Sequence, residues 1–393
     1  MPQAIIGFVA QNANNVLHAF SGGHNFQFEK AGYATTIINL LAPDCYEQLG
    51  AFARQHDILF GYGYAGIGAH LRADDGLFWD KLKIPFLSLL YDHPFYHPAL
   101  HKAPSQYVYN CYGIQDFLDV QRSYIKSTQP SLLLKVSSDG YANPHDVHWQ
   151  EIPWPRRDIL GIFLKTGDNP AIIEASFDVM PGLYRTITLD CIGQAKTNSN
   201  LNLADHVKER FARAGLDCAD PKIWEDFIYI VRVIDRYMRS WRSYQLVEHI
   251  KHLPVLIIGN GWDYIEKESA AAQFLPSMSM EDVKHLLYRT RFVFNAHPYA
   301  RHGWHERVFY GLEYGAAIIS DRTLFSDAHF ADLPNFVGFD WGDTFWPAKV
   351  KSAMARLGQQ GFDLRPGAMR LVEHFPAHAI SAQMLEIAHK ARQ

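Results

Sequence analysis

The feature that most constrains the fold of this chain is the alternation of short apolar runs with amphipathic stretches along almost its whole length. Parallel β-strands joined by crossover helices give this pattern, because such strands are buried on both faces and the helices on one. Strands are predicted in the first part of the chain at Ala4–Ala10, Thr35–Asn39, Asp57–Tyr62, Pro85–Leu90 and Gln106–Asn110. Helices are predicted between or after them at Gly23–Ala31, Tyr46–Gln55 and Ile114–Tyr124.

The same alternation restarts after a crossing rich in Pro and Trp, Trp149–Arg157, whose prolines disfavour helix and suit a linker. The strands predicted beyond it are Asp158–Lys165, Pro254–Ile258, Phe274–Leu275, Phe292–Asn295, Ala316–Ser320 and Phe336–Phe339. The helices predicted there are Ser279–Tyr288, His305–Tyr314 and Thr344–Leu357, together with a long, mostly helical segment at residues 170–252. The sequence therefore predicts two Rossmann-like α/β domains in tandem, 1–152 and 153–393, with a helical insertion in the second and a cleft between them.

Length and charge agree with two folded domains and argue against several classes of protein. The chain has 393 residues, and its 37 Lys and Arg against 41 Asp and Glu give a net charge of −4, which disfavours a nucleic-acid binder. Its 4 cysteines have no CxxC spacing, so no zinc or redox motif is indicated. The first residues lack the pattern of a signal peptide, and no apolar run is long enough to span a bilayer. We expect a cytoplasmic protein, with peripheral membrane association left open.

The most informative segment is residues 292–322, in which a strand runs through a polar loop into a helix. A helix N-terminus carries free N–H groups and the positive end of the helix dipole, so it suits a diphosphate. His305 and Arg307 lie at this N-terminus, and Glu306 in the first turn could accept hydrogen bonds from a ribose diol. Asn295 and His297 in the loop are predicted to lie near the phosphate or the sugar.

This segment resembles the donor-binding segment of glycosyltransferases with the GT-B fold, in particular those of the CgeB-like family. The residues that carry the resemblance are Asn295, His297, Pro298, His305, Glu306, Arg307, Val308, Phe309, Gly315, Ala316, Ser320 and Asp321. Residues 234–250, 253–263 and 274–289 are similar to neighbouring elements of that family, whereas the N-terminal half matches only in general layout. Glu306 and Glu313 are seven residues apart, where a common pattern of retaining enzymes has eight. The resemblance therefore does not assign Glu313 to the ligand or indicate a retaining outcome.

The resemblance implies a transferase that moves a sugar from a nucleotide sugar, most readily a UDP-sugar, to an acceptor hydroxyl of a glycan, a protein or a small molecule. It implies that the second domain binds the donor, with Glu306 on the ribose and with His305 and Arg307 at the diphosphate. It also implies that the reaction needs no cofactor and no metal ion.

Two other strand ends of the second domain offer weaker donor-binding candidates. Gly259, Asn260 and Gly261 follow a predicted strand, where glycines let the backbone pass close to a phosphate, although any tight turn after a strand uses them too. Lys165 ends the first strand of the domain, where it suits a diphosphate or simply faces solvent.

A general base for the acceptor hydroxyl is expected at the strand ends of the first domain. Asp92 and His93 follow the strand Pro85–Leu90, and His24 follows a Ser-Gly-Gly sequence where GT-B enzymes have a glycine-rich acceptor loop. Structural roles are the alternatives: Asp92 would cap the turn before Pro94, and the glycines before His24 would belong to a helix start.

The 20 histidines raise the alternative of a metal site. Three of them recur every fourth residue, His93, His97 and His101, but intervening prolines would break the helix that aligns them. No metal site is therefore predicted.

Two functional alternatives remain open. His297 and Pro298 resemble the His-Pro motif by which sialyl and Kdo transferases hold CMP, so a CMP-sugar donor is the first. A two-domain ligand-binding protein without catalysis is the second, and it would bind sugar but no nucleotide.

Overall fold

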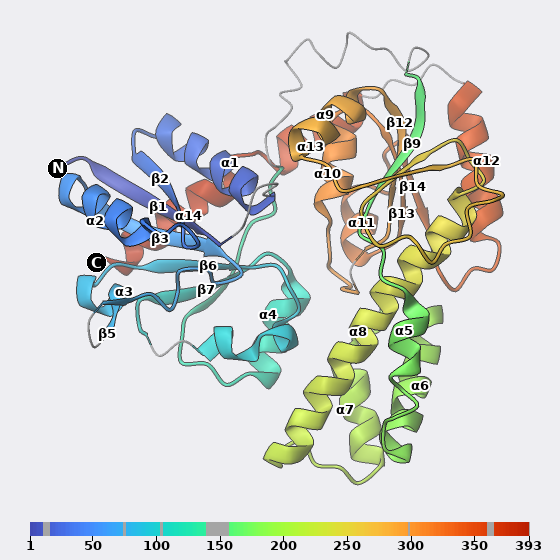
Figure 1. Ribbon diagram of the computed structural model, residues 1–393, viewed down its shortest axis with the longest axis horizontal. Coiled ribbons are helices and arrows are strands. Elements are labelled where there is room, and N and C mark those ends of the chain that lie inside the picture. The colour runs from blue at the N-terminus through green and yellow to red at the C-terminus, as the bar shows by residue number, and fades with distance from the viewer. Residues whose placement is uncertain are drawn as a thin grey trace. The chain divides into compact units, whose positions relative to one another are not determined.

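The computed structural model describes residues 1–10, 16–73, 76–102, 105–138, 157–297, 299–359 and 365–392. The chain divides into two compact units, Met1–Tyr141 together with Leu371–Gln393, and Ala142–Arg370. Each unit is built on one six-stranded sheet (Figure 1). The prediction of two Rossmann-like α/β domains is confirmed.

The first sheet has the strand order β2-β1-β3-β6-β7-β8, and its paired strands are all parallel. Its strands are β1 (Gln3–Val9), β2 (Ala34–Asn39), β3 (Asp57–Tyr64), β6 (Phe86–Leu90), β7 (Val108–Tyr112) and β8 (Ser131–Leu133). The helices of this unit are α1 (Val16–Lys30), α2 (Cys45–Gln55), α3 (Phe78–Leu82), α4 (Gln115–Tyr124) and α14 (Ala379–Ala391), with 3-10 turns η1 (Pro94–Tyr96) and η2 (Pro98–Lys102). A small antiparallel pair, β4 (Arg72–Ala73) and β5 (Gly76–Leu77), stands outside the sheet.

The C-terminal helix α14 departs from the predicted domain boundary. Its side chains Ile380, Met384 and Ala388 share one helix face and are buried in the core of the first unit, with Phe28 and Leu59. The apolar face of α14 thus packs on the first sheet, and the second unit ends at Arg370 instead of at the end of the chain. The predicted linker, Trp149–Arg157, lies outside the described residues except for Arg157.

Helix α1 also differs from its prediction. It begins at Val16 instead of Gly23, so the Ser-Gly-Gly sequence before His24 lies inside the helix. The expected glycine-rich loop is therefore wrong, because the apolar residues that precede the glycines continue the same helix.

The second sheet has the order β11-β10-β9-β12-β13-β14 and is also parallel throughout. Its strands are β9 (Ile159–Leu164), β10 (Leu256–Ile258), β11 (Gln273–Leu275), β12 (Thr290–Asn295), β13 (Ala317–Asp321) and β14 (Phe336–Phe339). The helices that follow or connect them are α9 (Met280–Tyr288), α10 (Glu306–Glu313), α11 (Leu324–His329), α12 (Trp346–Gln359) and α13 (Arg365–His374). Burial of the central strands explains why they read as continuous apolar runs in the sequence.

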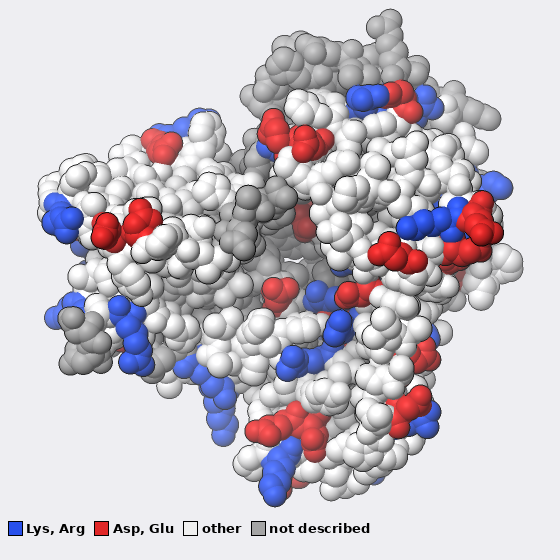
Figure 2. Space-filling view, in the orientation of Figure 1, with Lys and Arg blue, Asp and Glu red and all other residues white. Residues whose placement is uncertain are grey.

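The predicted helical insertion consists of four helices between β9 and β10. They are α5 (Pro170–Ala175), α6 (Gly182–Thr197), α7 (Leu203–Arg213) and α8 (Pro221–Ile250), and they extend away from the second sheet in Figure 1. The N-terminal half of α8 packs on α6 and α7, where Phe227 meets Phe211 and Tyr184 stacks on Phe211. Acidic and basic side chains are interspersed on the outside of these helices (Figure 2), so their surface has no single sign of charge.

Candidate functional site

The second sheet changes direction of winding between β9 and β12. The chain passes from β9 outward to β10 and β11, and then returns to the other side of β9 to form β12, β13 and β14. Open parallel sheets bind ligands beyond the carboxyl ends of the strands at such a switch point. A site is therefore expected at the carboxyl ends of β9 and β12, where Asn295 is the last residue of β12 and Lys165 and His297 lie just beyond the two strands.

The helix N-terminus predicted to hold a diphosphate is present beside this switch point. Helix α10 begins at Glu306, with His305 as its N-cap residue. The end of β12 leads into the loop that precedes α10, and the buried Arg157 donates hydrogen bonds to the carbonyls of Thr290 at 2.7 Å and Tyr314 at 2.8 Å. These two bonds tie the start of β12 to the end of α10, so the helix is fixed to the strand beside it.

The side chains of His305 and Glu306 are in contact at the start of α10. His305 Nδ1 lies 2.9 Å from Glu306 Oε2. Burial and the neighbouring Arg307 lower the pKa of His305 to about 3, so its imidazole is neutral at pH 7. Burial alone would raise the pKa of Glu306, but His305 and Arg307 outweigh it and hold that pKa below its ordinary range. Glu306 is therefore an ionised hydrogen-bond acceptor at a helix N-terminus.

Lys165 follows β9 directly and is half-buried. Burial lowers its pKa to about 8, with further lowering from Arg307 and Arg239 and opposing contributions from Glu306 and Asp168. The structure thus brings Lys165 within electrostatic range of the start of α10, although the two are about 140 residues apart in the sequence. A mostly protonated lysine and Arg307 together supply positive charge where the helix dipole is also positive.

Backbone packing explains why glycines occur in the loop after β10. Gly259 and Gly261 have φ values of 145° and 82°, and a Cβ on Gly259 would lie 2.2 Å from the carbonyl oxygen of Lys165. The close approach that these glycines permit is to the loop after β9, where Gly167 N–H donates to the carbonyl of Asn260 at 2.8 Å. The Asn260 side chain accepts a hydrogen bond from Ser277 N–H at 3.1 Å. These residues position the Lys165 loop, and donor contacts for Asn260 and Gly261 remain a prediction.

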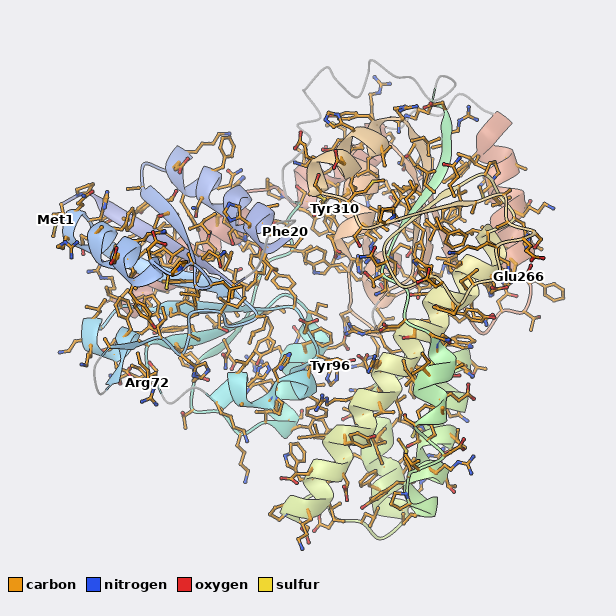
Figure 3. All side chains as sticks on the ribbon, in the orientation of Figure 1. Met1, Phe20, Arg72, Tyr96, Glu266 and Tyr310 are labelled. Atoms are coloured by element: carbon orange, nitrogen blue, oxygen red, sulfur yellow. The ribbon has the colours of Figure 1, made fainter. Side chains whose placement is uncertain are left out.

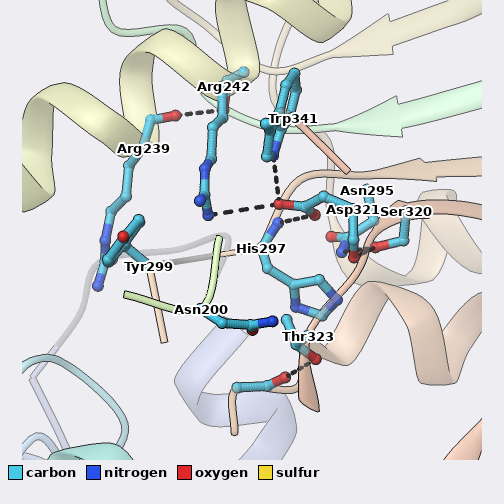
Figure 4. Close-up of polar contacts among 12 residues, drawn as sticks. Asn200, Arg239, Arg242, Asn295, His297, Tyr299, Ser320, Asp321, Thr323 and Trp341 are labelled. Atoms are coloured by element: carbon cyan, nitrogen blue, oxygen red, sulfur yellow. Dashed lines mark hydrogen bonds and ion pairs between the residues drawn. The ribbon is translucent and has the colours of Figure 1, made fainter. Parts of the chain in front are cut away.

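Asn295 and His297 are buried at the end of β12 and contact β13 (Figure 4). Asn295 Nδ2 donates to Ser320 Oγ at 2.9 Å, and the His297 backbone N–H donates to Asp321 Oδ1 at 2.8 Å. Burial lowers the pKa of His297. Neither of its ring nitrogens has a hydrogen-bond partner among the residues that the structure describes.

Asp321 completes this cluster through a pairing with Arg242 that the sequence did not predict. Asp321 Oδ2 accepts a hydrogen bond from Trp341 Nε1–H at 2.8 Å and lies 3.6 Å from Arg242 NH1, a side chain of α8. Arg242 and Asp321 are 2% and 1% exposed, so this is a buried ion pair. One signal was available: Arg242 lies four residues from both Met238 and Leu246, on the apolar face of α8.

The base candidates of the first unit have different environments. Asp92 follows β6, is exposed, and has no hydrogen-bond or ion-pair partner in the described ranges of the chain. His93 is buried and caps η1, since its Nδ1 accepts from Phe95 N–H at 3.3 Å. The side chain of Tyr96, labelled in Figure 3, belongs to the same turn. Of these two candidates, Asp92 is thus the one whose side chain is exposed to solvent.

His24 is a structural residue. Its Nδ1 lies 3.0 Å from Ser381 Oγ of α14, and its Nε2 lies 2.8 Å from the Tyr64 hydroxyl. The side chain is buried in the first unit with both nitrogens engaged, which leaves neither for an acceptor hydroxyl. The prediction of His24 as a base is corrected accordingly.

Acid is expected to destabilise the protein through His24. Burial lowers its pKa to about 4, whereas in the unfolded chain the pKa is about 6.5. The unfolded state therefore binds more protons between these values, and stability falls as the pH drops through 6.5 towards 4. At pH 5 the loss from His24 is roughly 2 kcal/mol relative to pH 7.5. Thermal unfolding at the two pH values measures this loss of stability. His24→Gln should lose less stability than the wild type between pH 7.5 and pH 5. The control, His70→Gln, changes an exposed residue and should lose as much as the wild type. An equal fall in His24→Gln would contradict the assignment.

Among the described residues, no group of three or more His, Cys, Asp or Glu side chains is arranged to hold a metal ion. Nor does any helix in the described ranges have the length and apolar character needed to cross a membrane.

The chain is similar to known proteins in structure but not in sequence. No protein-family model and no curated protein matches the chain in sequence. An α-glucosyltransferase solved in complex with UDP matches with a TM-score of 0.56 at 9% identity, covering 99% of this chain and 100% of that one. Sucrose-phosphate synthase from Thermosynechococcus elongatus matches with a TM-score of 0.54 at 9% identity, covering 99% and 98%. The chain has the GT-B fold. At this identity the likeness is one of fold, and roles for individual residues of this GT-B chain rest on its own geometry.

Proposed function

We propose that this protein is a glycosyltransferase that moves a sugar from a nucleotide sugar, most readily a UDP-sugar, to an acceptor hydroxyl. The observation that carries the proposal is geometric: Lys165 follows β9, and the neighbouring strand β12 leads to α10, which begins with Glu306 and Arg307, at the switch point of the second sheet. Positive charge, free N–H groups and one ionised carboxylate are what a nucleoside diphosphate requires. Solved neighbours of the same fold that hold UDP or UDP-glucose support it.

In this proposal each group acts on the donor. Glu306 accepts hydrogen bonds from the ribose diol through the carboxylate face that His305 leaves open. Lys165, Arg307 and the α10 N-terminus bind the diphosphate, whose negative charge grows as the glycosidic bond breaks. Because these donors are already in place, they stabilise the transition state more than the ground state. They would serve without a metal ion or cofactor.

The acceptor is assigned to the first unit, with Asp92 as the general base that takes the proton of the attacking hydroxyl. Asp92 is favoured over His93 because its carboxylate is exposed, whereas the His93 ring is buried and caps a turn. Membership of the CgeB-like family is proposed on the motif around residues 295–321. Glycans, proteins and small molecules all remain acceptor candidates.

Calorimetry with UDP, GDP, CMP and dTDP tests the donor site. We expect UDP to bind most tightly, and Glu306→Ala to weaken it about 10-fold or more, because a hydrogen bond to a charged group contributes roughly 1.5–3 kcal/mol. The matched control is Glu281→Ala, an exposed carboxylate on α9 that should leave the affinity unchanged. A preference for CMP would favour the CMP-sugar alternative. If none of the four nucleotides bound, the proposal would be wrong, and sugar binding alone would favour the ligand-binding protein.

A further inference from the structure

The loop between β12 and α10 carries His297, Tyr299 and His305, and the helical insertion holds it at two points. The first is the buried Asp321, which binds the His297 N–H through Oδ1 and faces Arg242 of α8 through Oδ2. The second is Tyr299, whose ring lies 4.6 Å from the Arg242 guanidinium carbon and whose hydroxyl donates to the carbonyl of Asn198 at 2.9 Å. Asn198 follows α6 and Arg242 lies in α8, so the insertion supplies one contacting residue at each point. Figure 4 shows Arg242 with Asp321 and Tyr299.

Helix α8 is suited to fix this loop because it belongs to two packed regions at once. Its 30 residues span about 45 Å. Leu246, Val247 and Ile250 at its C-terminal end are buried in the core beneath the second sheet, and its N-terminal half packs on α6 and α7. Arg242 lies between these regions, so its position is set by packing on either side.

The end of α6 also packs closely on the strand ends. A Cβ on Gly342 would lie 2.5 Å from the carbonyl oxygen of Thr197, and Gly342 directly follows Trp341, whose Nε1–H donates to Asp321. The insertion therefore reaches the same cluster from α6 and from α8. If the insertion only enlarged the core, apolar contacts with the strand ends would be enough. The insertion instead places the buried cation of Arg242 beside the carboxylate of Asp321.

We propose that the helical insertion holds the β12–α10 loop in its donor-binding conformation, with Arg242 as a positioning residue that acts through Asp321 and Tyr299. This inference rests on the proposed donor site. Arg242 is assigned no contact with the nucleotide. Its effect is transmitted through the His297 N–H and the Tyr299 ring to the loop that ends at His305.

The test measures the Kd for UDP and the melting temperature of five proteins: wild type, Arg242→Met, Arg242→Lys, Tyr299→Phe and Arg213→Met. Arg242→Met should weaken UDP binding about tenfold or more in protein that circular dichroism shows to be folded, because the loop is no longer held through Asp321 and Tyr299. Arg242→Lys should recover part of that affinity, since it restores the charge but not the planar group over Tyr299. Tyr299→Phe, which removes only the bond to Asn198, should weaken binding about two- to tenfold. Arg213→Met removes an exposed cation of α7 and is the control, with no change expected.

A merely structural Arg242 would lower the melting temperature and leave the Kd of the folded protein unchanged. UDP affinity within twofold of wild type in folded Arg242→Met would overturn the inference while the donor site stood. If Arg242→Met does not fold, Arg242→Lys and Tyr299→Phe decide, and wild-type affinity in both would overturn it. A wild-type protein that binds no UDP would remove the donor site and this inference with it.

Discussion

Replacing Lys165 with methionine is expected to lower kcat for sugar transfer about 100-fold or more. The leaving nucleoside diphosphate gains charge in the transition state, and removing one preorganised donor to such a charge typically costs 10² to 10³ in rate. Lys165 is the cation placed directly at the switch point of the second sheet, half-buried and near Arg307 and Glu306. Methionine keeps most of the length and the apolar character of the lysine side chain, so the substitution mainly removes the positive charge.

A pH profile distinguishes this role from a loss of packing. Burial and Arg307 lower the pKa of Lys165 to about 8, so the free protein loses this positive charge as the pH rises through 8. Donor affinity should therefore fall between pH 7 and 9 in the wild type, and this fall should be absent in Lys165→Met. The control is Lys349→Met, a 69% exposed lysine on α12 that should keep both the rate and the profile. A Lys165→Met enzyme with near wild-type kcat would remove Lys165 from the mechanism.

Asp321→Ala is expected to cause the largest loss of stability. The substitution leaves Arg242 buried at 2% exposure without its carboxylate, and breaking a buried ion pair typically costs about 3–5 kcal/mol. The N–H groups of His297 and Trp341 lose their acceptor at the same time. Chemical denaturation that follows the second unit, for example through its tryptophans, measures the change.

Two further variants distinguish the loss of the buried Arg242–Asp321 ion pair from the loss of any surface charge. Asp178→Ala removes an exposed ion pair with Arg185 and should cost less than about 1 kcal/mol. Adding Arg242→Met to Asp321→Ala should recover part of the lost stability, because no uncompensated buried charge remains. Simple addition of the two single losses in the double variant would show that Arg242 and Asp321 do not interact.

Local patterns in the sequence predicted the elements that lie at the donor site. The run that predicts a strand at Phe292–Asn295 is β12, and the polar residues before the apolar helix are where α10 begins, with His305 as its N-cap. These predictions succeeded because a strand buried on both faces and a helix with one apolar face leave separate periodicities. Strand β8 was not predicted.

The contacts that the sequence did not predict join residues far apart in the chain. The partners of Arg242 are Asp321 and Tyr299, which only the packing of α8 on the strand ends brings together. His24 looked like a base after flexible glycines, but its partner Ser381 comes from a helix at the other end of the chain. The glycines after β10 looked like a phosphate loop, but the backbone they approach belongs to the loop of Lys165. In each case the partner that the structure shows belongs to an element far away in the sequence.

The most direct test of the account is a crystal structure of the protein with UDP. We predict that the diphosphate lies beyond the carboxyl ends of β9 and β12, within hydrogen-bond distance of Lys165 Nζ and of the first N–H groups of α10, with the ribose at Glu306. Binding of UDP at the first sheet, or at the second sheet without contacts to Lys165 and α10, would contradict it.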